Sequence, residues 1–434
     1  MRYQTPKGTF DLFPPEIEKW QEVERVACEV AELFGYREIR TPVFEYTEIF
    51  SRGIGEATDI VEKEMYTFRD RGGRSLTLKP EWTAPVVRAF IQHNLDKQEG
   101  VFRFYYTGPI FRYERPQAGR YRQSHQFGVE ALGSLSPLLD AEVIALAMEF
   151  YQRLSISGLK VDLNSIGCGS ENCRVKYKKL LVEYLEQNEK ELCDDCRRRI
   201  SQNPLRVFDC KKRGCREVVK KAPLILENLC PDCAGHFAEV KEALGDLDIP
   251  YRVNPGIVRG LDYYTRTVFE LVSEHLGAQN ALCGGGRYDD LVEVLGGRAT
   301  PAVGFAAGIE RAVLVRDKQI GESREGSPIP LMLFPMGERA EKSCAQLALK
   351  LRKAGVKTCL EIKKSVKAAL RNAVKNRVKL FLILGEDELK EEKIAVKNLE
   401  TEKQIFIPRR EFNSLLENFS GDNLVAEILA FFEN

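Results

Sequence analysis

Two short segments of this 434-residue chain place an arginine where it can bind a phosphate. The first segment is residues 111–114 (FRYE), in which Arg112 ends a strand-like run of aromatic and β-branched residues. The second is residues 304–311 (GFAAGIER), in which glycines admit a ligand close to the backbone and Arg311 faces it. A guanidinium suits a phosphate and steadies its developing charge. Each pattern also has a structural alternative, a surface ion pair for the first and tight helix–sheet packing for the second.

Eight of the twelve cysteines form four closely spaced pairs. The pairs are Cys168-x4-Cys173, Cys193-x2-Cys196, Cys210-x4-Cys215 and Cys230-x2-Cys233. Eight thiolates suffice for two tetrahedral metal sites, and zinc is the first candidate. Disulfides, an iron–sulfur cluster and unligated thiols stay open as alternatives, and the sequence does not tell which pair joins which. We expect a structural role for these cysteines.

Hydrophobic periodicity predicts the elements that position the first arginine. Apolar residues at helical spacing predict a helix at 16–34, followed by a short strand at 36–41. Strands within 97–112 and at 123–130 predict an antiparallel hairpin with a long basic loop, and 138–153 is again helical.

The second half of the chain changes character twice. Residues 165–240 are highly charged with helical patches, which indicates an inserted module, and strand-like sequence then returns at 258–272 and 281–287. Residues 316–328 are polar with glycine, serine and proline, which predicts a linker. Strands and helices then alternate, which predicts a small α/β domain with strands at 330–334, 357–361 and 379–384 and helices at 340–354 and 365–376.

Composition is that of a globular protein, with 44% hydrophobic and 30% charged residues. No apolar run reaches the roughly 18–20 residues that cross a bilayer, and no secretory signal is visible, so we expect a cytoplasmic protein with no membrane partner. The net charge of +1 does not indicate nucleic-acid binding. Local basic stretches at 103–122 and 363–379 can bind RNA, although both can equally be solvated surface.

Several blocks, taken in order, resemble known motifs. Pro42 after a helix and strand, residues 111–114 and residues 308–311 resemble motifs 1, 2 and 3 of class II aminoacyl-tRNA synthetases. Residues 258–265 (VRGLDYYT) and 281–289 (ALCGGGRYD) resemble the two histidine motifs of the histidyl-tRNA synthetases. Residues 7–11 and 383–388 fit the same family, so the likeness covers essentially the whole chain.

The resemblance implies a fold and a reaction. The fold is α+β: a class II antiparallel-sheet catalytic core (1–165 and 243–320) with a cysteine-rich helical insertion (166–242), and a C-terminal α/β anticodon-binding domain (328–434). The reaction is ATP-dependent ligation of L-histidine to its tRNA through a histidyl-adenylate, with release of AMP and pyrophosphate. The family further implies Mg²⁺ with ATP and a homodimer built on motif 1.

The resemblance also assigns roles to residues. Arg112 holds the ATP α-phosphate and Arg259 is the catalytic cation there, with Glu114 and Arg311 also at ATP. A salt bridge to Asp262 is the structural alternative for Arg259. The histidine site comprises seven residues: Glu81, Thr83, Gln126, Glu130, Tyr263, Tyr264 and Tyr288. Carboxylates suit the ammonium group, and a site that bonds both ring nitrogens rejects apolar isosteres, although the tyrosines can also be core aromatics. The tRNA acceptor end is expected at Arg115, Gln117 and Arg122, and the anticodon at the C-terminal domain.

Two positions depart from the family pattern. Ser124 stands where an aromatic side chain often stacks on adenine, and Trp82 replaces a smaller residue beside the amino-acid pocket. Three other functions are weighed against the synthetase: a regulatory paralogue from histidine biosynthesis, an RNA-binding protein on the same scaffold, and a class II synthetase for threonine, proline or glycine. The retained Arg112 and Arg259 and the long C-terminal segment argue against the first, and the intact sets of phosphate-binding and amino-acid-binding residues argue against the second. The two histidine motifs argue against the third.

Overall fold

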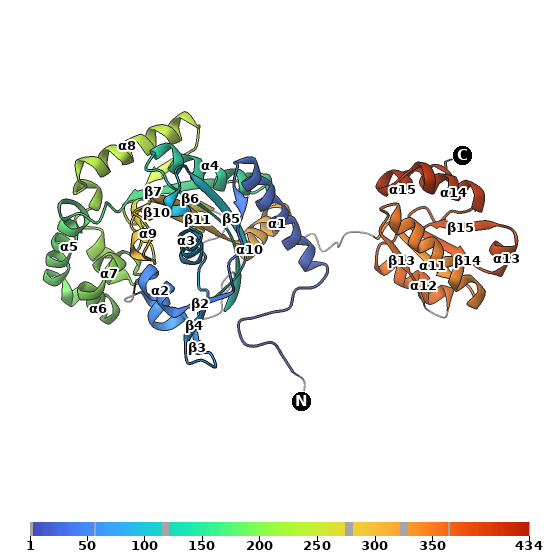
Figure 1. The fold of residues 1–434 in the computed structure, drawn as a ribbon, viewed down its shortest axis with the longest axis horizontal. Helices are drawn as coiled ribbons and strands as arrows, with labels where there is room; N and C mark the ends of the chain where they lie inside the picture. The colour runs from blue at the N-terminus through green and yellow to red at the C-terminus, as the bar shows by residue number, and fades with distance from the viewer. Residues whose placement is uncertain are drawn as a thin grey trace. The chain divides into compact units, whose positions relative to one another are not determined.

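The computed structural model describes residues 3–55, 58–114, 121–273, 281–321, 329–362 and 365–433. The chain forms two compact units, Met1–Ser323 and Arg324–Asn434, each with a sheet of its own (Figure 1). Among the described residues, no helix is both long and apolar enough to span a bilayer.

An eight-stranded sheet forms the centre of the first unit, in the order β1-β5-β6-β11-β10-β9-β7-β8. The six inner strands pair antiparallel, whereas the edge strands β1 and β8 pair parallel to their neighbours. The predicted hairpin is confirmed, with Phe111 opposite Gln123 next to the turn. The strands in sheet order are β1 (Arg37–Glu38), β5 (Phe102–Phe111), β6 (Gln123–Leu132), β11 (Ala302–Gly308), β10 (Ala281–Arg287), β9 (Thr265–Ser273), β7 (Leu159–Ser165) and β8 (Tyr251–Val253).

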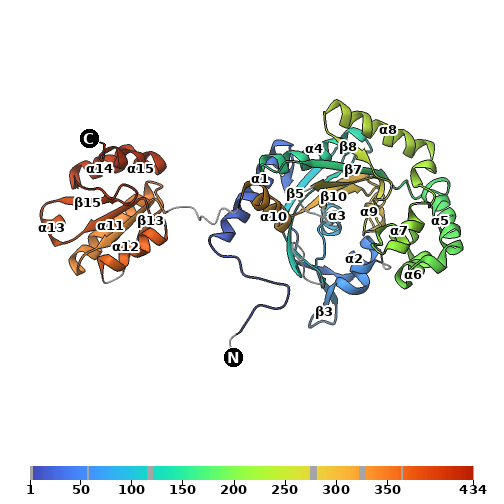
Figure 2. The ribbon, with the colours of Figure 1, turned by 180° about the vertical axis from the view of Figure 1, so that it is seen from behind.

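Successive side chains of a strand point to opposite faces of this sheet. Tyr105 of β5 packs with α1 (Glu16–Leu33) and α4 (Pro137–Arg153) in the main core. Tyr106 points the other way and packs with Trp82 and Val86 at the start of α3 (Thr83–Gln92). On the α1–α4 face, α8 (Pro231–Asp246) and α10 (Ile309–Ile320) also contribute buried residues to the main core, and Figure 2 shows these helices from behind. The functional cavities described below lie on the α3 face.

Smaller elements frame the α3 face. α2 (Thr47–Ile54) and α9 (Leu291–Val294) pack on α3. A three-stranded antiparallel sheet lies beside them, in the order β2 (Phe44–Tyr46), β4 (Ser75–Leu78), β3 (Tyr66–Arg69). These strands have three or four residues each, too few for an alternating pattern to predict them.

Between β7 and β8 the chain forms a helical module. It begins with a π-helical turn at Glu171–Val175 and continues through α5 (Lys176–Gln187), α6 (Asp194–Gln202), α7 (Arg213–Val219) and α8. A short 3-10 helix, η5 (Pro204–Asp209), connects α6 with α7.

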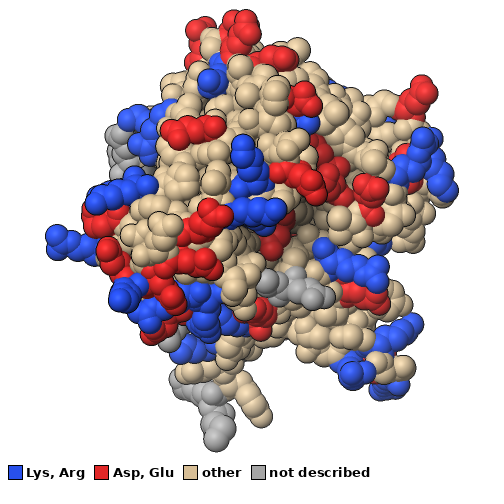
Figure 3. Space-filling view, turned by 90° about the vertical axis from the view of Figure 1, so that its left-hand side faces the viewer, with Lys and Arg blue, Asp and Glu red and all other residues tan. Residues whose placement is uncertain are grey.

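On the face shown in Figure 3, basic and acidic side chains are interspersed, in keeping with the net charge of +1 (Figure 3).

The second unit holds a five-stranded sheet, in the order β13-β12-β14-β15-β16. The predicted alternation of strands and helices is confirmed through β12 (Leu331–Pro335), α11 (Glu338–Lys353), β13 (Thr358–Leu360), α12 (Val366–Lys375) and β14 (Leu380–Leu384). These three strands pair parallel, and the apolar runs of β12 and β14 are buried. The antiparallel pair after them was not predicted; the remaining elements are α13 (Glu386–Lys390), β15 (Lys393–Asn398), β16 (Gln404–Pro408), α14 (Arg409–Asn418) and α15 (Gly421–Ala430).

Three local predictions are wrong. Residues 316–320 belong to α10 and not to a linker, because Arg316 pairs with Glu22 of α1 at 2.8 Å and Asp317 with Lys19. The rest of that predicted linker, 322–328, lies outside the described residues. The strand expected from 258 begins only at Thr265, and the strand expected at 36–41 is limited to β1.

Candidate active site

Two adjoining cavities open on the α3 face of the main sheet. The first, of about 170 Å³, is lined by acidic and tyrosine side chains, and we call it the histidine cavity after the motifs that form it. The second, of about 270 Å³, is lined by arginines and by the ends of β6, β10 and β11, and we call it the nucleotide cavity. Four residues line both cavities and therefore mark their junction: Arg112, Gln126, Arg259 and Gly284.

Glu130 of β6 is the centre of the histidine cavity. Its buried carboxylate accepts hydrogen bonds from the hydroxyls of Thr83 (2.7 Å), Tyr106 (3.1 Å) and Tyr288 (2.5 Å). Burial raises the pKa of Glu130 to about 8, against the hydrogen bonds from Tyr288 and Thr83, which lower it. The predicted residues Thr83, Glu130 and Tyr288 thus come from three distant segments of the chain and meet here.

Glu81 lies beside this network, before the first turn of α3. Its carboxylate accepts from the backbone N–H of Thr83 at 2.6 Å and of Ala84 at 2.9 Å. Burial raises the pKa of Glu81, while these N–H groups oppose the rise. A buried negative charge at a helix N-terminus is held by free N–H groups and by the helix dipole, which fixes Glu81 against the cavity.

Two further tyrosines and a glutamine complete the predicted set. Tyr263 packs on Tyr264 and Tyr288, with ring centroids 4.8 Å and 5.7 Å away. Gln126 reaches the junction, and its buried Oε1 has no hydrogen-bond partner among the described residues. An unpaired buried acceptor is costly, so Gln126 points to a donor supplied by a ligand.

Glycines clear the floor of both cavities. A β-carbon at Gly304 of β11 would collide with the carboxylate of Glu130, and one at Gly284 of β10 would collide with the guanidinium of Arg259. The glycines of the segments 281–289 and 304–311 therefore lie on β10 and β11, the strands under the site. Gly308 is the last residue of β11, directly before α10. Both interpretations of residues 304–311 therefore hold, because the same glycines allow close packing and leave room for the cavity.

Arg259 lies at the junction and is mostly buried, with 19% of its side chain exposed. It donates to Glu270 of β9 at 2.5 Å and lies over the ring of Tyr264, 5.7 Å from its centroid. Burial disfavours its charge, but Tyr264 and Glu270 raise the pKa of the guanidinium above its usual value. The ion pair of Arg259 is therefore with Glu270 and not with Asp262, which accepts from Asn203 at 2.6 Å.

Arg112 faces Arg259 across the same junction. Its Nε donates to the carbonyl of Pro80 at 2.7 Å, and its Nη1 lies 3.9 Å from Glu114. Arg311, on the first turn of α10, lines the far side of the nucleotide cavity and donates to the carbonyl of Ala281. The structure thus brings all four predicted nucleotide residues to one cavity.

The two departures from the family pattern have structural consequences. The hydroxyl of Ser124 donates to the carbonyl of Tyr121 at 3.1 Å, and Tyr121 is one of the residues that line the nucleotide cavity. Trp82 stacks on Tyr106 with ring centroids 4.7 Å apart, and the ammonium of Lys79 lies 2.9 Å from the centroid of a Trp82 ring. Trp82 therefore forms a wall of the histidine cavity.

Of the residues expected at the tRNA acceptor end, the structure describes one. Arg122 lies over the ring of Tyr113, 3.8 Å from its centroid, and its backbone N–H bonds Gly8. Arg115 and Gln117 lie outside the described residues.

The eight paired cysteines gather into two groups of four. The outer cluster comprises Cys168, Cys173, Cys230 and Cys233, and the inner cluster comprises Cys193, Cys196, Cys210 and Cys215. Within each cluster all four sulfurs lie within 4.8 Å of one another, which suits one tetrahedral metal ion. No cysteine forms a disulfide in the structure, and the pairing that the sequence left open is first pair with fourth, second with third.

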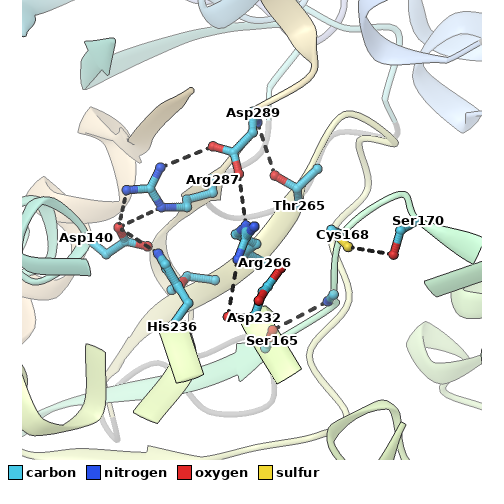
Figure 4. A network of polar contacts seen from close by, with 12 residues as sticks. Asp140, Ser165, Cys168, Ser170, Asp232, His236, Thr265, Arg266, Arg287 and Asp289 are labelled. Atoms are coloured by element: carbon cyan, nitrogen blue, oxygen red, sulfur yellow. Dashed lines mark hydrogen bonds and ion pairs between the residues drawn. The ribbon is translucent and has the colours of Figure 1, made fainter. Parts of the chain in front are cut away.

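Sequence reasoning missed the partners that hold the site. Glu270 carries no motif of its own, yet it orients Arg259. Arg287 is fully buried and bonds Asp140 at 2.8 Å, Asp289 at 3.1 Å and two carbonyls, which fixes the strand end before Tyr288 (Figure 4). A fully buried arginine needs such partners, but the sequence does not show that Asp140 is one of them.

Comparison with known proteins agrees with this geometry. A family model described as histidyl-tRNA synthetase matches residues 8–312, and an anticodon binding domain model matches 331–419. The histidine–tRNA ligases of Halothermothrix orenii and Natranaerobius thermophilus are 48% and 46% identical, over 94% and 97% of this chain and 97% and 100% of their own. The apo S. aureus histidyl-tRNA synthetase structure is 36% identical, with a TM-score of 0.79 over 96% of this chain and 100% of that one.

The antiparallel sheet, the paired cavities and the appended C-terminal unit define a class II aminoacyl-tRNA synthetase. The predicted fold class and enzyme class are therefore confirmed. Within that class, the chain belongs to the histidyl-tRNA synthetase family.

Proposed function

We propose that this chain ligates L-histidine to its tRNA in two steps, with Arg259 and Arg112 as catalytic residues. In the first, a carboxylate oxygen of histidine attacks the α-phosphorus of ATP, the bond to the bridging oxygen breaks, and pyrophosphate leaves. In the second, a ribose hydroxyl at the tRNA 3′ end attacks the carbonyl carbon of the histidyl-adenylate, and AMP leaves. Family membership supports this overall reaction.

The observation that carries the proposal is the junction of the two cavities. An amino acid in the histidine cavity and a nucleotide in the other cavity meet where both Arg112 and Arg259 line the wall. Two fixed guanidiniums there stabilise the negative charge that gathers on the α-phosphate as pyrophosphate departs. Holding both reactants in adjoining cavities also removes the entropic cost of their encounter.

Histidine recognition follows from the groups in its cavity. The charge of Glu81 suits the ammonium group of the substrate, and Glu130 accepts from an imidazole N–H. Tyr264 and Tyr288 enclose the ring, while Thr83, Gln126 and Tyr263 provide the remaining polar wall. The unpaired Oε1 of Gln126 supports a ligand donor at this place. An apolar isostere would leave these buried polar groups unpaired and be rejected.

ATP is assigned to the nucleotide cavity. Arg311 contacts the adenine or the outer phosphates, and Glu114 lies near the nucleotide. Mg²⁺ accompanies ATP, because the outer phosphates need a hard cation with oxygen ligands and keep it hydrated. Structural Zn²⁺ is assigned to the two cysteine clusters, whose four converging thiols fit one ion each.

Binding of tRNA is divided between the two units. Arg115, Gln117 and Arg122 are assigned to the acceptor end, and residues 328–434 to the anticodon. On α12 the exposed side chains of Lys367, Arg371 and Lys375 recur every four residues, which gives one face a basic stripe for phosphates. Residues 1–165 and 243–320 form the catalytic core, and 166–242 form its insertion. A homodimer is assigned to motif 1 near Pro42.

Amino-acid-dependent ATP–pyrophosphate exchange tests the proposal. We expect exchange with histidine and with none of the other nineteen amino acids. Arg259→Ala should lower its rate by about 10²- to 10³-fold, because a charge-stabilising donor is lost at the reacting phosphate. The matched control is Arg25→Ala, which removes an exposed arginine paired with Glu29 on α1 and should leave the rate unchanged. A folded wild-type protein without exchange would overturn the enzyme assignment.

A further inference from the structure

Both cysteine clusters have the dimensions of a single-ion site. Zinc–sulfur bonds of about 2.3 Å in a tetrahedron place the sulfurs about 3.8 Å apart. Cys168 and Cys230 of the outer cluster have their Sγ atoms 3.9 Å apart, and so do Cys193 and Cys210 of the inner cluster. A disulfide needs about 2.0 Å, and sulfurs within 4.8 Å of one another leave no room for a core of several irons and sulfides.

The clusters are also built alike. In each, the first cysteine of the C-x2-C pair directly precedes a helix, Cys193 before α6 and Cys230 before α8. Its backbone N–H points at a sulfur of the C-x4-C pair, from Cys193 to Cys215 at 3.3 Å and from Cys230 to Cys173 at 3.5 Å. Helix N-termini and N–H donors both favour thiolate, the form that binds metal. The repeated plan indicates two metal sites and not two accidental gatherings of thiols.

The outer cluster is joined to the first histidine motif through the backbone. Ile166, two residues before Cys168, donates to the carbonyl of Arg266 at 2.8 Å, and Arg266 donates back to Gly167 at 2.9 Å. Arg174, next to Cys173, donates to the carbonyl of Tyr264 at 2.5 Å. Arg266 has a φ of 47°, a conformation that costs energy for a residue with a side chain, so these bonds are needed to hold it.

The side chain of Arg266 extends this connection to the second histidine motif. Its guanidinium lies between the carboxylate of Asp289, at 3.5 Å, and the backbone carbonyl of Asp232, at 3.4 Å (Figure 4). Asp232 stands between the two cysteines of the C-x2-C pair of the outer cluster, and Asp289 directly follows Tyr288. One arginine thus connects the cluster with the segments that carry both Tyr264 and Tyr288.

We propose that the outer cluster binds a structural zinc ion that positions Tyr264 and Tyr288, so that metal loss weakens histidine use more than ATP use. This inference rests on the proposed histidine site. The nucleotide cavity depends on β6, β10, β11 and α10, and none of the contacts that join the outer cluster to the histidine motifs involves its arginines. The residues around the cluster are therefore positioning residues, and their effect falls on one substrate.

The inner cluster serves as the comparison. The segment after α6, next to this cluster, contacts the first histidine motif through side chains: Asn203 donates to Asp262 at 2.6 Å. From the same segment, Arg206 donates to Asp59 at 2.9 Å. Asp262 lies two residues before Tyr264, and its hydrogen bonds go to Asn203 and to the carbonyl of Ile54 and not to the backbone of Tyr264 or Arg266. Loss of the inner metal should affect histidine use less than loss of the outer metal.

Metal content is measured first, on the purified full-length protein, by mass spectrometry of zinc and iron. We expect two zinc ions per chain in the wild type, and one in each of C230S/C233S and C193S/C196S. Cys359→Ser, which removes a half-buried cysteine of the second unit, should keep both ions. Iron in place of zinc, disulfides found by thiol titration, or metal-free protein would each overturn the zinc assignment whatever the enzyme does.

Steady-state ATP–pyrophosphate exchange then tests the coupling. C230S/C233S should raise the KM for histidine at least about 10-fold while the KM for ATP stays within about 3-fold, a size typical of losing support behind a site. C193S/C196S should raise the histidine KM less. Equal effects on both substrates, or one zinc lost with an unchanged histidine KM, would overturn the coupling.

Arg174→Ala separates the contact from the metal, and serves if the double variant fails to fold. It should keep two zinc ions and still raise the histidine KM by about 3- to 10-fold, because the bond to the Tyr264 carbonyl is lost while all four cysteines of the cluster stay. Arg198→Ala, which removes an exposed arginine of α6, should change neither quantity. An unchanged histidine KM in Arg174→Ala would overturn the coupling. Absence of exchange in wild-type protein that contains zinc would instead overturn the proposed function.

Discussion

The histidine cavity and the nucleotide cavity share a wall but are built on opposite principles. In the histidine cavity the polar groups bond one another: three hydroxyls converge on Glu130, and Glu81 is held by the start of α3. In the nucleotide cavity Arg112 and Arg311 each donate to a backbone carbonyl, which holds a guanidinium against the cavity. The first arrangement favours selection of one side chain, and the second favours binding of charge.

The difference shows how specificity is obtained. Burial disfavours the charged form of a carboxyl group, as the raised pKa of Glu130 indicates. A ligand that offers an N–H or a positive charge stabilises the carboxylate, whereas an apolar ligand of equal size does not. An arginine-lined cavity gains from any phosphate, so its selectivity must come from the shape of the adenine site.

The largest expected effect is on Glu130. Glu130→Gln keeps the volume but replaces one acceptor oxygen by an NH2 donor and cannot become charged when a cationic ligand binds, so we expect kcat/KM for histidine to fall by about 100-fold or more, with the KM for ATP within about 3-fold. Exchange kinetics with each substrate varied in turn measures both. Glu114→Gln, in the other cavity, should show the reverse pattern, with the ATP KM raised and the histidine KM kept. Equal losses on both substrates in either variant would contradict the division of the cavities.

A second prediction concerns stability against pH. Because burial raises the pKa of Glu130 to about 8, the folded chain holds a proton there that the unfolded chain releases near pH 4.5. Stability from this group is therefore present at low pH and lost as the pH rises from about 4.5 to 8. Glu130→Gln lacks this loss, which is roughly 3.5 kcal/mol between pH 5 and pH 8. At about 2–4 °C per kcal/mol, the Tm of the variant relative to wild type should therefore increase by roughly 10 °C over that range.

Calorimetry on both proteins without substrate measures that difference. Groups far from Glu130 are common to both proteins and cancel in the comparison, whereas Glu81, which interacts with Glu130, contributes to the measured difference. A Tm difference that does not change with pH would show that Glu130 is ionised throughout and that the hydroxyls stabilise its charge.

The contrast between the cavities also separates what the sequence could predict from what it could not. The hairpin of β5 and β6 was predictable because its residues are close in sequence and alternate clearly. The residues of each cavity were predicted from the resemblance to the histidyl-tRNA synthetases, and the structure brings the described ones together. The partner of Arg259 was not predictable, since Glu270 and Asp262 are both nearby carboxylates and only the register of β9 decides between them.

The pairing of the cysteines was unpredictable for a similar reason. Short spacings identify pairs, but the contact of Cys168 with Cys230 joins residues 62 positions apart and depends on how α5 to α8 fold back. The short strands of the β2-β4-β3 sheet were missed because segments of three or four residues carry no periodic signal. The predicted linker began too early in the sequence, because the polar residues at the end of α10 have the composition of a linker. Only the structure shows that Arg316 and Asp317 form ion pairs with α1.

The smallest expected effect concerns the adenine site of the nucleotide cavity. Ser124 has no ring, but Tyr121 also lines this cavity. The Ser124 hydroxyl bonds the Tyr121 carbonyl, and the Phe10 ring packs edge-to-face with the Tyr121 ring, with centroids 4.7 Å apart. If Tyr121 supplies the stack, Tyr121→Ala should raise the KM for ATP by about 2- to 10-fold, the value of one aromatic contact, and leave the KM for histidine unchanged. Tyr121→Phe keeps the ring and should behave as wild type in the same exchange assay. An ATP KM that is unchanged in Tyr121→Ala would mean that shape and Arg311 alone select the base, which would make the nucleotide cavity even less like its neighbour.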